Sequence, residues 1–400
     1  MYKLRNLFLA GLVITSFVVS AQENKEEEKG YQFTSIKEIP CTSVKDQGRS
    51  GTCWSFSGLG FIEAEMLRIG KPEVDLSEMF VVHHAYSDKA TKYVRLHGSL
   101  NFGPGGAFHD VTNVIRQYGI VPEEVYNGLN YGEDKHVHGE MDRTLLDQVK
   151  VVVDNSNKKP TTAWHDALNG ILDSYLGKLP EKFKYQDKEY TPQSFVQEFV
   201  GLNLDDYVEI SSYTNHPFYS KFIIEVPDNW SWDEVYNVPI NELAEIIDNS
   251  INSGYTVAWA ADVSEKGFST SKKGIAVIPA VDKANMTDAE IAKWEKLSEE
   301  EKNEELYKLT KPSTERVITQ EMRQIDYDNY QTTDDHGMLI VGTAKDQIGN
   351  MYYKVKNSWG DYNDFQGYFY ASKPYVTFKT MSIMVNKNAI PKNIRKKLNL

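Results

Sequence analysis

The stretch Gln47-Gly48-Arg49-Ser50-Gly51-Thr52-Cys53-Trp54-Ser55-Phe56 places a cysteine where small residues give way to a helical pattern. Apolar residues then recur at spacings of three and four up to Ile69, and Gly70-Lys71-Pro72 ends the pattern. The positive end of a helix dipole stabilises a thiolate in the first turn of that helix. The sequence therefore predicts a reactive thiol at Cys53, and the small residues before it would let a carbonyl group approach the backbone.

A reactive thiol needs a base, and the base needs an orienting group. Asp335-His336-Gly337 lies at the expected start of one strand, and Lys356-Asn357-Ser358-Trp359-Gly360 at the expected end of another. In this interpretation Asn357 orients the imidazole of His336, and Trp359 screens the pair from water. The side-chain amide of Gln47 and the N–H of Cys53 would together form an oxyanion hole.

The order of the expected elements, helices first and sheet last, predicts an α+β fold. A second helix is expected over 75–85, and a third runs from the Gly-rich loop 103–106 to Tyr118. The later elements expected are a helix over 241–253, strands over 255–263, 338–342, 351–357 and 367–371, and an exposed helical insertion with two capping boxes over 282–308.

Three motifs in this chain order, QGRSGTCWSF (47–56), DHGMLIVG (335–342) and KNSWG (356–360), resemble those of the papain superfamily of cysteine peptidases. Leu76-Ser77-Glu78 and Gly105-Gly106 match further motifs of that superfamily. More narrowly, the chain is similar to the bleomycin hydrolase/aminopeptidase C branch. Ser50 replaces a disulfide cysteine, the C-terminal segment 385–391 matches, and His336 follows Cys53 by 283 residues instead of the ~130–150 usual for papain-like enzymes.

The resemblance implies that Cys53 is the nucleophile, His336 the base and later the acid, Asn357 the orienting residue and Gln47 an oxyanion donor. It also implies that Gly105 and Gly106 line the cleft and bind substrate backbone. The implied fold is papain-like, with a helical lobe and a β-barrel-like lobe. One peptidase domain would span 31–400, with large insertions at about 127–240 and 264–330.

The first 21 residues have the features of a secretory signal peptide. Lys3 and Arg5 precede an apolar run from Leu7 to Val19, and a small residue, Ala21, ends the segment. The run is shorter than the ~20 residues of a membrane-spanning helix, which disfavours an anchor. We therefore expect an exported protein, periplasmic or extracellular, with a disordered acidic lead-in over 22–30 and no membrane contact after the signal is removed.

The composition excludes several other classes of protein. The chain has 44 Lys+Arg and 57 Asp+Glu, a net charge of −13, and acidity of this kind argues against nucleic acid as a partner. Two cysteines cannot form a disulfide framework, and Cys41 is expected to be structural. His136-Val137-His138 is interpreted as an exposed loop without a third ligand of matching spacing, so no metal and no cofactor are expected.

The leading functional hypothesis is a secreted cysteine peptidase that uses a Cys-His-Asn triad on oligopeptides, in the manner of an aminopeptidase. In the branch, a C-terminal arm enters the cleft and its carboxylate binds the substrate's amino group. Here only a short segment follows 385–391, so an endopeptidase of broader specificity is an alternative. A catalytically silent binding or scaffold homologue is another, which the complete catalytic set disfavours. The branch also suggests a hexameric homo-oligomer.

Overall fold

A computed structural model describes residues 30–400 of the chain. The predicted signal peptide and nearly all of the acidic lead-in fall within residues 1–29 and therefore lie outside the described residues. Among the helices that are described, none combines the length and the apolar character needed to cross a membrane.

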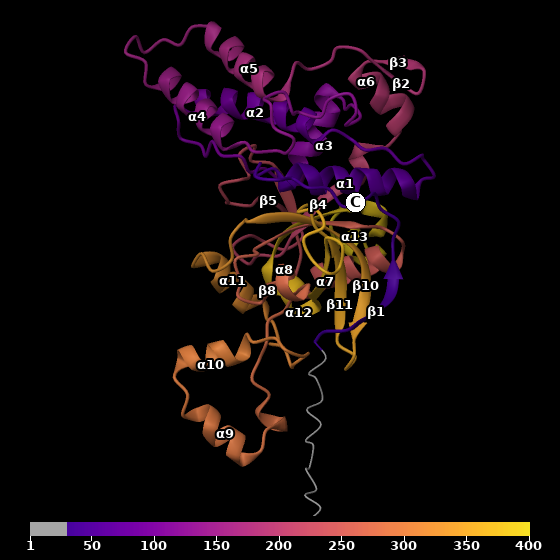
Figure 1. Ribbon diagram of the computed structural model, residues 1–400, viewed down its shortest axis with the longest axis vertical. Coiled ribbons are helices and arrows are strands. Elements are labelled where there is room, and N and C mark those ends of the chain that lie inside the picture. Colours follow the sequence, from indigo (N-terminus) through magenta and orange to yellow (C-terminus); the bar gives the residue numbers. More distant parts are fainter. Residues whose placement is uncertain (1–29) are drawn as a thin grey trace, which may run out of the picture.

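Helices dominate the first half of the described chain and gather at one end of the molecule (Figure 1). The α1 helix lies between this group and the sheet. The helices of this half are α1 (Cys53–Arg68), α2 (Glu78–Arg95), α3 (Phe108–Tyr118), α4 (Gly139–Val153), α5 (Ala163–Leu176) and α6 (Pro192–Phe195), which continues into a π turn at Val196–Val200.

The second half forms an 11-stranded sheet with the order β5-β6-β4-β13-β7-β10-β11-β12-β9-β8, to which β1 adds by pairing with β10. Its strands are β1 (Phe33–Glu38), β4 (Tyr207–Ser211), β5 (Lys221–Ile223), β6 (Glu234–Asn237), β7 (Val257–Ala261), β8 (Phe268–Ser269), β9 (Ile275–Ala276), β10 (His336–Asp346), β11 (Met351–Lys356), β12 (Tyr368–Ser372) and β13 (Thr380–Asn386). The α+β prediction is confirmed. The barrel-like lobe is an open sheet, because β5 and β8 lie at opposite ends of the strand order without pairing.

The remaining elements connect or cover the sheet. A two-stranded hairpin, β2 (Phe183–Tyr185) with β3 (Lys188–Tyr190), lies beside α6. The other helices are α7 (Ile240–Asn252), α8 (Thr270–Lys273), α9 (Asp288–Glu295), α10 (Glu299–Leu306), α11 (Gln320–Asp328), α12 (Lys373–Lys379) and α13 (Lys392–Lys397), with short 3-10 turns at Leu204–Asp206, Lys283–Asn285 and Lys387–Ala389.

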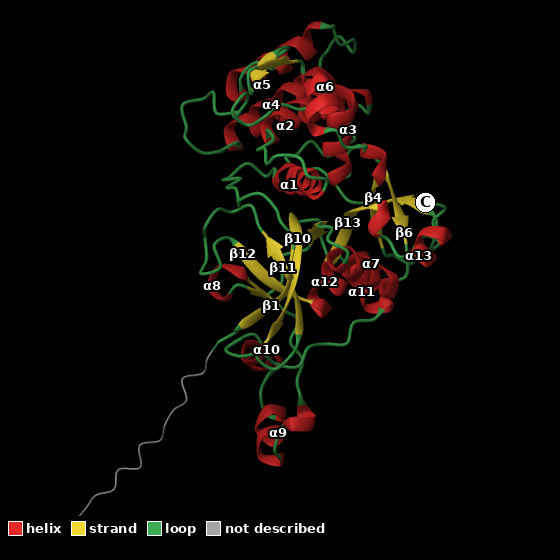
Figure 2. Ribbon diagram, turned by 90° about the vertical axis from the view of Figure 1, so that its right-hand side faces the viewer, coloured by secondary structure: helices red, strands yellow, loops and turns green. Residues whose placement is uncertain are grey.

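Two central strands carry the ends of the histidine and asparagine motifs to the same edge of the sheet. His336 is the first residue of β10, and Asn357 follows the last residue of β11. The two strands are antiparallel, with Leu339 opposite Lys356. The start of one and the end of the other therefore lie side by side, and this edge faces α1 (Figure 2).

A close approach between α1 and β10 joins the two halves. A Cβ built on Gly337 would lie 2.6 Å from Ser57 Oγ and 3.3 Å from the Cα of Trp54, so no side chain fits at this position. Ser57 Oγ itself donates a hydrogen bond to the carbonyl of Cys53 at 2.6 Å. The contact brings the first turn of α1, with Cys53, next to the first residues of β10.

Most expected elements are present, with some differences in length. Helix α2 extends ten residues beyond the expected end at Ala85. The pattern looked polar there, but Tyr86, Ala90 and Tyr93 keep a buried stripe at helical spacing. Both capping boxes are confirmed, at Thr287 of α9 and Ser298 of α10. Strands β1 and β13 were not expected, although β13 pairs with both β4 and β7.

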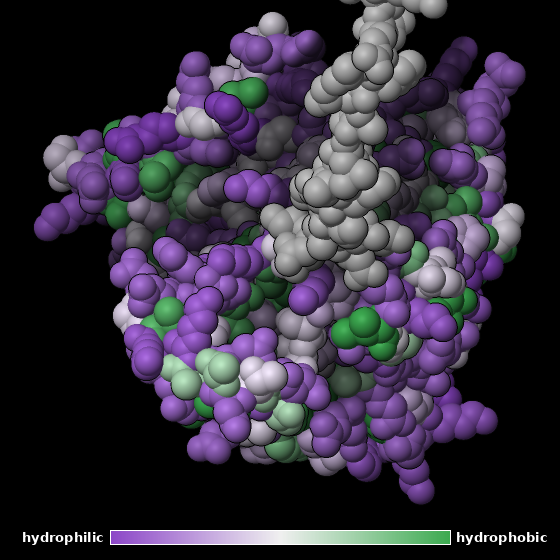
Figure 3. Space-filling model, turned by 60° about the horizontal axis from the view of Figure 1, so that its bottom comes forward, coloured by the Kyte–Doolittle hydropathy of each residue, from purple (hydrophilic) through white to green (hydrophobic). Residues whose placement is uncertain are grey.

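The two long middle segments behave differently. Within 127–240, the strands β4, β5 and β6 are part of the main sheet rather than a separate unit. Within 264–330, α9 and α10 form a hairpin that projects away from the rest of the molecule. Neither helix buries a residue. The face that includes this end of the molecule is mostly hydrophilic, with small separate apolar patches (Figure 3).

The Gly337 contact generates a prediction. Gly337→Ala should lower the free energy of unfolding by roughly 1–3 kcal/mol, because a methyl group must be forced between α1 and β10. Gly170→Ala is the matched control, since Gly170 lies in α5 with no atom within 4 Å of the added Cβ, and alanine favours a helix. Chemical denaturation measures both. Equal stability of the Gly337 variant and the parent would show that the contact is not a constraint.

Candidate active site

A cavity of about 500 Å³ opens where α1, the Gly-rich loop and the start of β10 meet. Cys53 and Trp54 line it from α1, and His336 lines it from β10. Gln47, Trp359, Gly105 and Gly106 line the same cavity. Asn357 is buried behind His336 with 2% of its surface exposed. The structure thus brings the residues of the predicted site together. Asn357 does not line the cavity itself but contacts the imidazole of His336, which does.

The imidazole of His336 is fixed from two sides. Its Nε2 donates a hydrogen bond to Asn357 Oδ1 at 2.7 Å, and Nδ1 takes no part in this bond. The indole of Trp359 stacks on the ring, with centroids 4.7 Å apart and planes inclined by 28°. Asn357 is itself held, because its Nδ2 donates to Tyr362 Oη at 3.1 Å and its Oδ1 also accepts from the N–H of Ser358.

Ser358 holds the side chain of Gln47, a contact that the sequence reasoning did not identify. Its hydroxyl donates to Gln47 Oε1 at 2.6 Å, and its carbonyl accepts from the N–H of Gln47 at 2.8 Å. With Oε1 engaged, Nε2 of Gln47 is the group left for a substrate oxygen. The signal in the sequence was the position of Ser358 beside Asn357 in the same motif. This one chain segment contacts both His336 and Gln47.

Burial disfavours the charged form of both Cys53 and His336. It raises the pKa of the Cys53 thiol to about 12, against the opposing effect of hydrogen bonds from the N–H groups of Gly337 and Trp54. It also lowers the pKa of His336 to about 4, although the Asn357 hydrogen bond raises it. The two groups line the same cavity, where opposite charges on them would stabilise each other.

A buried lysine holds the Gly-rich loop. Lys89 is 2% exposed, and its ammonium donates to the carbonyls of Gly103 and Gly105. Trp54 Nε1 donates to the carbonyl of Pro104 at 3.1 Å. A Cβ on Gly105 would lie 1.8 Å from Asp228 Oδ2, so the Asp228 carboxylate rests directly on this glycine.

Four carboxylates also line the cavity: Glu209, Asp228, Asp334 and Asp335. Of these, only Asp335 belongs to a motif of the sequence. His109 lines the cavity too and lies 3.0 Å from Glu209 through Nδ1. Burial lowers the pKa of His109, but the Glu209 carboxylate overrides this effect and raises it to about 10. Only their place in the fold brings these residues together. The adjacent acids 334–335, beside the histidine motif, were the one signal in the sequence.

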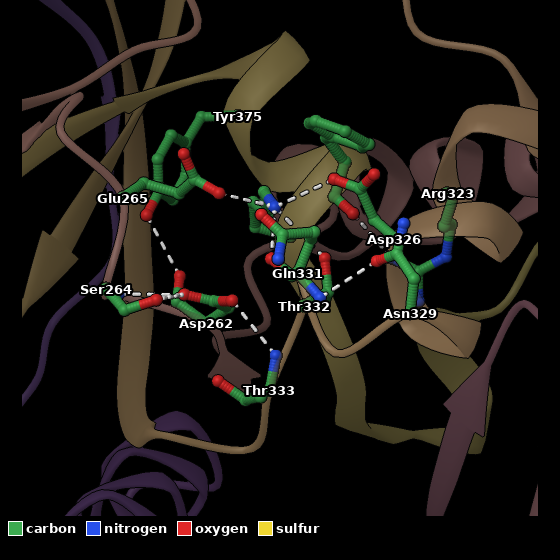
Figure 4. A network of polar contacts seen from close by, with 12 residues as sticks. Asp262, Ser264, Glu265, Arg323, Asp326, Asn329, Gln331, Thr332, Thr333 and Tyr375 are labelled. Atoms are coloured by element: carbon green, nitrogen blue, oxygen red, sulfur yellow. Dashed lines mark hydrogen bonds and ion pairs between the residues drawn. The ribbon is translucent and has the colours of Figure 1, made fainter.

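A polar network fixes the loop that leads into His336 (Figure 4). The ammonium of Lys379, fully buried, donates to the Gln331 carbonyl and to Thr332 Oγ1. It also forms ion pairs with Glu265 at 2.5 Å and Asp326 at 3.1 Å. The N–H of Thr333 donates to Asp262 Oδ2 at 2.9 Å. The loop is therefore tied to α11 and α12 immediately before the catalytic strand.

Within residues 30–400, one cluster of acids has ligand atoms close enough for a metal ion: Glu63, Asp75 and Glu78. The ammonium of Lys45 lies among them, 3.0 Å from Glu63 Oε1, 2.7 Å from Glu78 Oε1 and in contact with Asp75. Burial lowers the pKa of Lys45, but the three carboxylates override this and hold it well above its usual value. Glu78 of the Leu76-Ser77-Glu78 motif therefore serves this internal ion pair.

Two other expectations concern residues away from the cavity. The prediction of an exposed loop at His136 and His138 is wrong, because these side chains are only 8% and 1% exposed. The ring of His136 packs against Phe56, which explains the burial. Cys41 is a free thiol that lies 3.7 Å from Tyr368 Oη and packs against the core that includes α1.

The arrangement defines a class of protein. A thiol at the start of a helix shares a cleft with an imidazole on a strand, and an asparagine orients that imidazole. A helical lobe and a sheet lobe flank the cleft. This is the architecture of the papain-like cysteine peptidases.

The comparisons with known proteins place the chain within that class. A family model described as "Peptidase C1-like family" matches residues 4–310 and 301–400. The chain belongs to this family and is a cysteine peptidase, and its relatives confirm the resemblance to the bleomycin hydrolase/aminopeptidase C branch.

Similar proteins are found at low identity over most of the chain. Aminopeptidase C of Lactobacillus delbrueckii subsp. lactis is 23% identical, covering 96% of this chain and 88% of that protein. Aminopeptidase C of Streptococcus thermophilus is 22% identical, covering 92% and 85%. The crystal structure of PepW from Lactobacillus rhamnosis HN001 superposes with a TM-score of 0.65 at 20% identity, covering 92% of this chain and 84% of that one. The structural similarity supports the fold.

The Lys379 network generates a second prediction. Lys379→Met should lower the free energy of unfolding by roughly 3 kcal/mol, because it leaves Glu265 and Asp326 without their buried cation. It should also lower kcat/KM, since the loop before His336 loses its anchor. Lys308→Met is the control, because Lys308 pairs with Glu305 on an exposed helix and such pairs contribute little. Thermal unfolding and peptide turnover measure both, and a variant as stable as the control would refute the assignment.

Proposed function

We propose that this protein is an aminopeptidase of the thiol type that removes residues from the free N-termini of oligopeptides, using Cys53, His336 and Asn357. The observation that carries the proposal is the hydrogen bond from His336 Nε2 to Asn357 Oδ1, in a cavity that Cys53 also lines. The names of the similar proteins, Aminopeptidase C in both species, support the choice of an exopeptidase.

In the proposed mechanism, Cys53 Sγ attacks the carbonyl carbon of the scissile bond while its proton passes to His336 Nδ1. The oxygen that becomes negative accepts hydrogen bonds from Gln47 Nε2 and from the N–H of Cys53. As the C–N bond breaks, His336 returns the proton to the departing amine. Water then attacks the thioester with His336 as base, and the acid leaves as Cys53 regains its proton.

Two further features of the proposal come from the sequence alone. Export rests on residues 1–21, and a hexameric assembly rests on the resemblance to the branch. Both stay predictions, since residues 1–29 lie outside the described part of the chain and only a single chain is described.

The central test uses the nucleophile. Cys53→Ala should reduce turnover of a free-amine aminoacyl fluorogenic amide by roughly 10⁴-fold or more, and His336→Ala by a similar factor, because groups that act as a unit are not additive. The control is Cys41→Ala, which removes the other thiol and should keep most of the activity. Turnover by the Cys53 variant at the parental rate would refute the mechanism.

The same assay separates the alternatives. The wild-type protein should cleave the free-amine amide faster than its N-acetylated counterpart. Equal cleavage of the two would replace the aminopeptidase by an endopeptidase. Cleavage of neither, by folded and reduced protein, would favour a silent binding homologue.

Asn357 should set the acid limit of activity. Its hydrogen bond raises the pKa of His336, which burial lowers to about 4, so Asn357→Ala should lower that pKa further. The acid limb of the profile of kcat/KM against pH should therefore move to lower pH, by about one pH unit for the loss of one such bond. Tyr362→Phe is the control, because it removes only the acceptor of Asn357 Nδ2. An unchanged or higher acid limit in the Asn357 variant would contradict the orienting role.

A further inference from the structure

The active-site cavity is lined by more carboxylates than cations. Four carboxylates line it, and no Lys or Arg of residues 30–400 does. Two of the four are already engaged. Glu209 pairs with His109, while Asp335 accepts from the N–H of Val263 at 3.1 Å and from Thr333 Oγ1 at 2.7 Å. Asp228 and Asp334 form no ion pair with a described residue, although the charge of Lys89 behind the Gly-rich loop partly offsets that of Asp228.

These two carboxylates have few partners of their own. Asp228 accepts one weak hydrogen bond, from Asn101 Nδ2 at 3.3 Å, and Asp334 has no hydrogen bond or ion pair with any described residue. Burial and the charge of Asp228 together raise the pKa of Asp334 to about 8, and a cation bound between the two carboxyl groups would favour its ionised form. Both charges also raise the pKa of Cys53, so both lie within electrostatic reach of the nucleophile.

A third acceptor lines the same cavity. Asn229 is 4% exposed, and its Nδ2 donates to the carbonyls of Ile224 and Asp233, each at 3.1 Å. These two bonds fix the amide, yet its Oδ1 has no partner among the described residues. A buried oxygen without a donor is unfavourable, so a ligand that brings N–H groups would satisfy it.

We propose that Asp228 and Asp334, with Asn229 Oδ1, form the subsite that binds the α-ammonium group of the peptide substrate. The inference deepens the proposed function and rests on it. An ammonium offers three N–H donors and a positive charge, which match one amide oxygen and two carboxyl groups. Its binding also relieves the repulsion between the two carboxylates.

The position of Asp228 favours an α-ammonium over a basic side chain. Its carboxylate rests on Gly105, along which the substrate backbone is expected to run. A cation held there lies close to the backbone, as the N-terminal nitrogen does, whereas the charge of Lys or Arg lies at the end of a long stem. The adjacent lining residues are apolar and suit an apolar side chain on the first residue: Ile224, Val226, Val235 and Met381.

The carboxylates that form this subsite belong to side chains within the fold. None of the described residues after Ser382 lines the cavity. Leu400 instead packs against the core cluster that includes Ile394 and α7. Asp228 and Asp334 lie 106 residues apart in the sequence and reach the cavity from separate segments.

The experiment compares three substrates: a free-amine leucyl fluorogenic amide, its N-acetylated form, and an N-acetylated Arg-Leu amide. Asp334→Asn and Asp228→Asn should each raise KM for the free-amine substrate about tenfold or more, the effect of losing one hydrogen bond to a charged group. kcat should change little, and kcat/KM for the N-acetyl-leucyl amide should not fall. Asp288→Asn, which removes an equal charge from exposed α9, is the control and should change nothing.

The deciding quantity is the ratio of kcat/KM for the free-amine leucyl amide to kcat/KM for its N-acetylated form. A general effect on the thiol or on folding changes both values alike and cancels in this ratio. An unchanged ratio in both variants would overturn the proposal. A loss confined to the Arg-Leu substrate would also overturn it and assign the subsite to a basic side chain. If wild-type protein cleaves none of the three, the proposed function fails. If it cleaves the free amine and the variants keep the wild-type ratio, only this subsite fails.

Discussion

The close contact between the first turn of α1 and the start of β10 is the constraint on which the other features depend. Gly337 leaves no room for a side chain between the two elements, so the helix and the strand meet at one defined distance. Cys53 and His336 lie 283 residues apart in the sequence and become neighbours only through this contact. The sheet register then adds Asn357 and Ser358 behind the imidazole.

Buried ammonium groups hold the parts of the cleft in place. Lys45 joins α1 and α2 through three carboxylates, Lys89 holds the Gly-rich loop, and Lys379 ties down the loop before His336. Both cysteines are free, so no disulfide contributes. An unpaired charge in a protein interior is strongly unfavourable. Each of these lysines therefore favours the folded arrangement in which its ammonium contacts its partners.

The sequence motifs predicted which side chains would lie together, because each motif is local. Cys53, His336, Gln47 and the Gly105-Gly106 pair line one cavity, and Asn357 contacts His336 from behind. Asp228 and Asp334 escaped notice because their roles depend on distant segments that only the folded chain brings together. The burial of His136 and His138 was not predicted for the same reason, because residues distant in the sequence can cover a polar stretch. Strand β13 was missed because its partners, β4 and β7, precede it by more than 100 residues.

The loop over 331–335 has a consequence for how such an enzyme can diverge. It carries Asp334 two residues before His336, and its anchors fix both residues as one rigid piece. Loss of the anchors of this loop would disturb reactivity together with recognition, so selection should conserve them. The opposite wall of the cavity, formed by residues within 224–229, belongs to a different chain segment from His336. New substrate preferences can therefore evolve on that wall while the reactive pair is inherited unchanged.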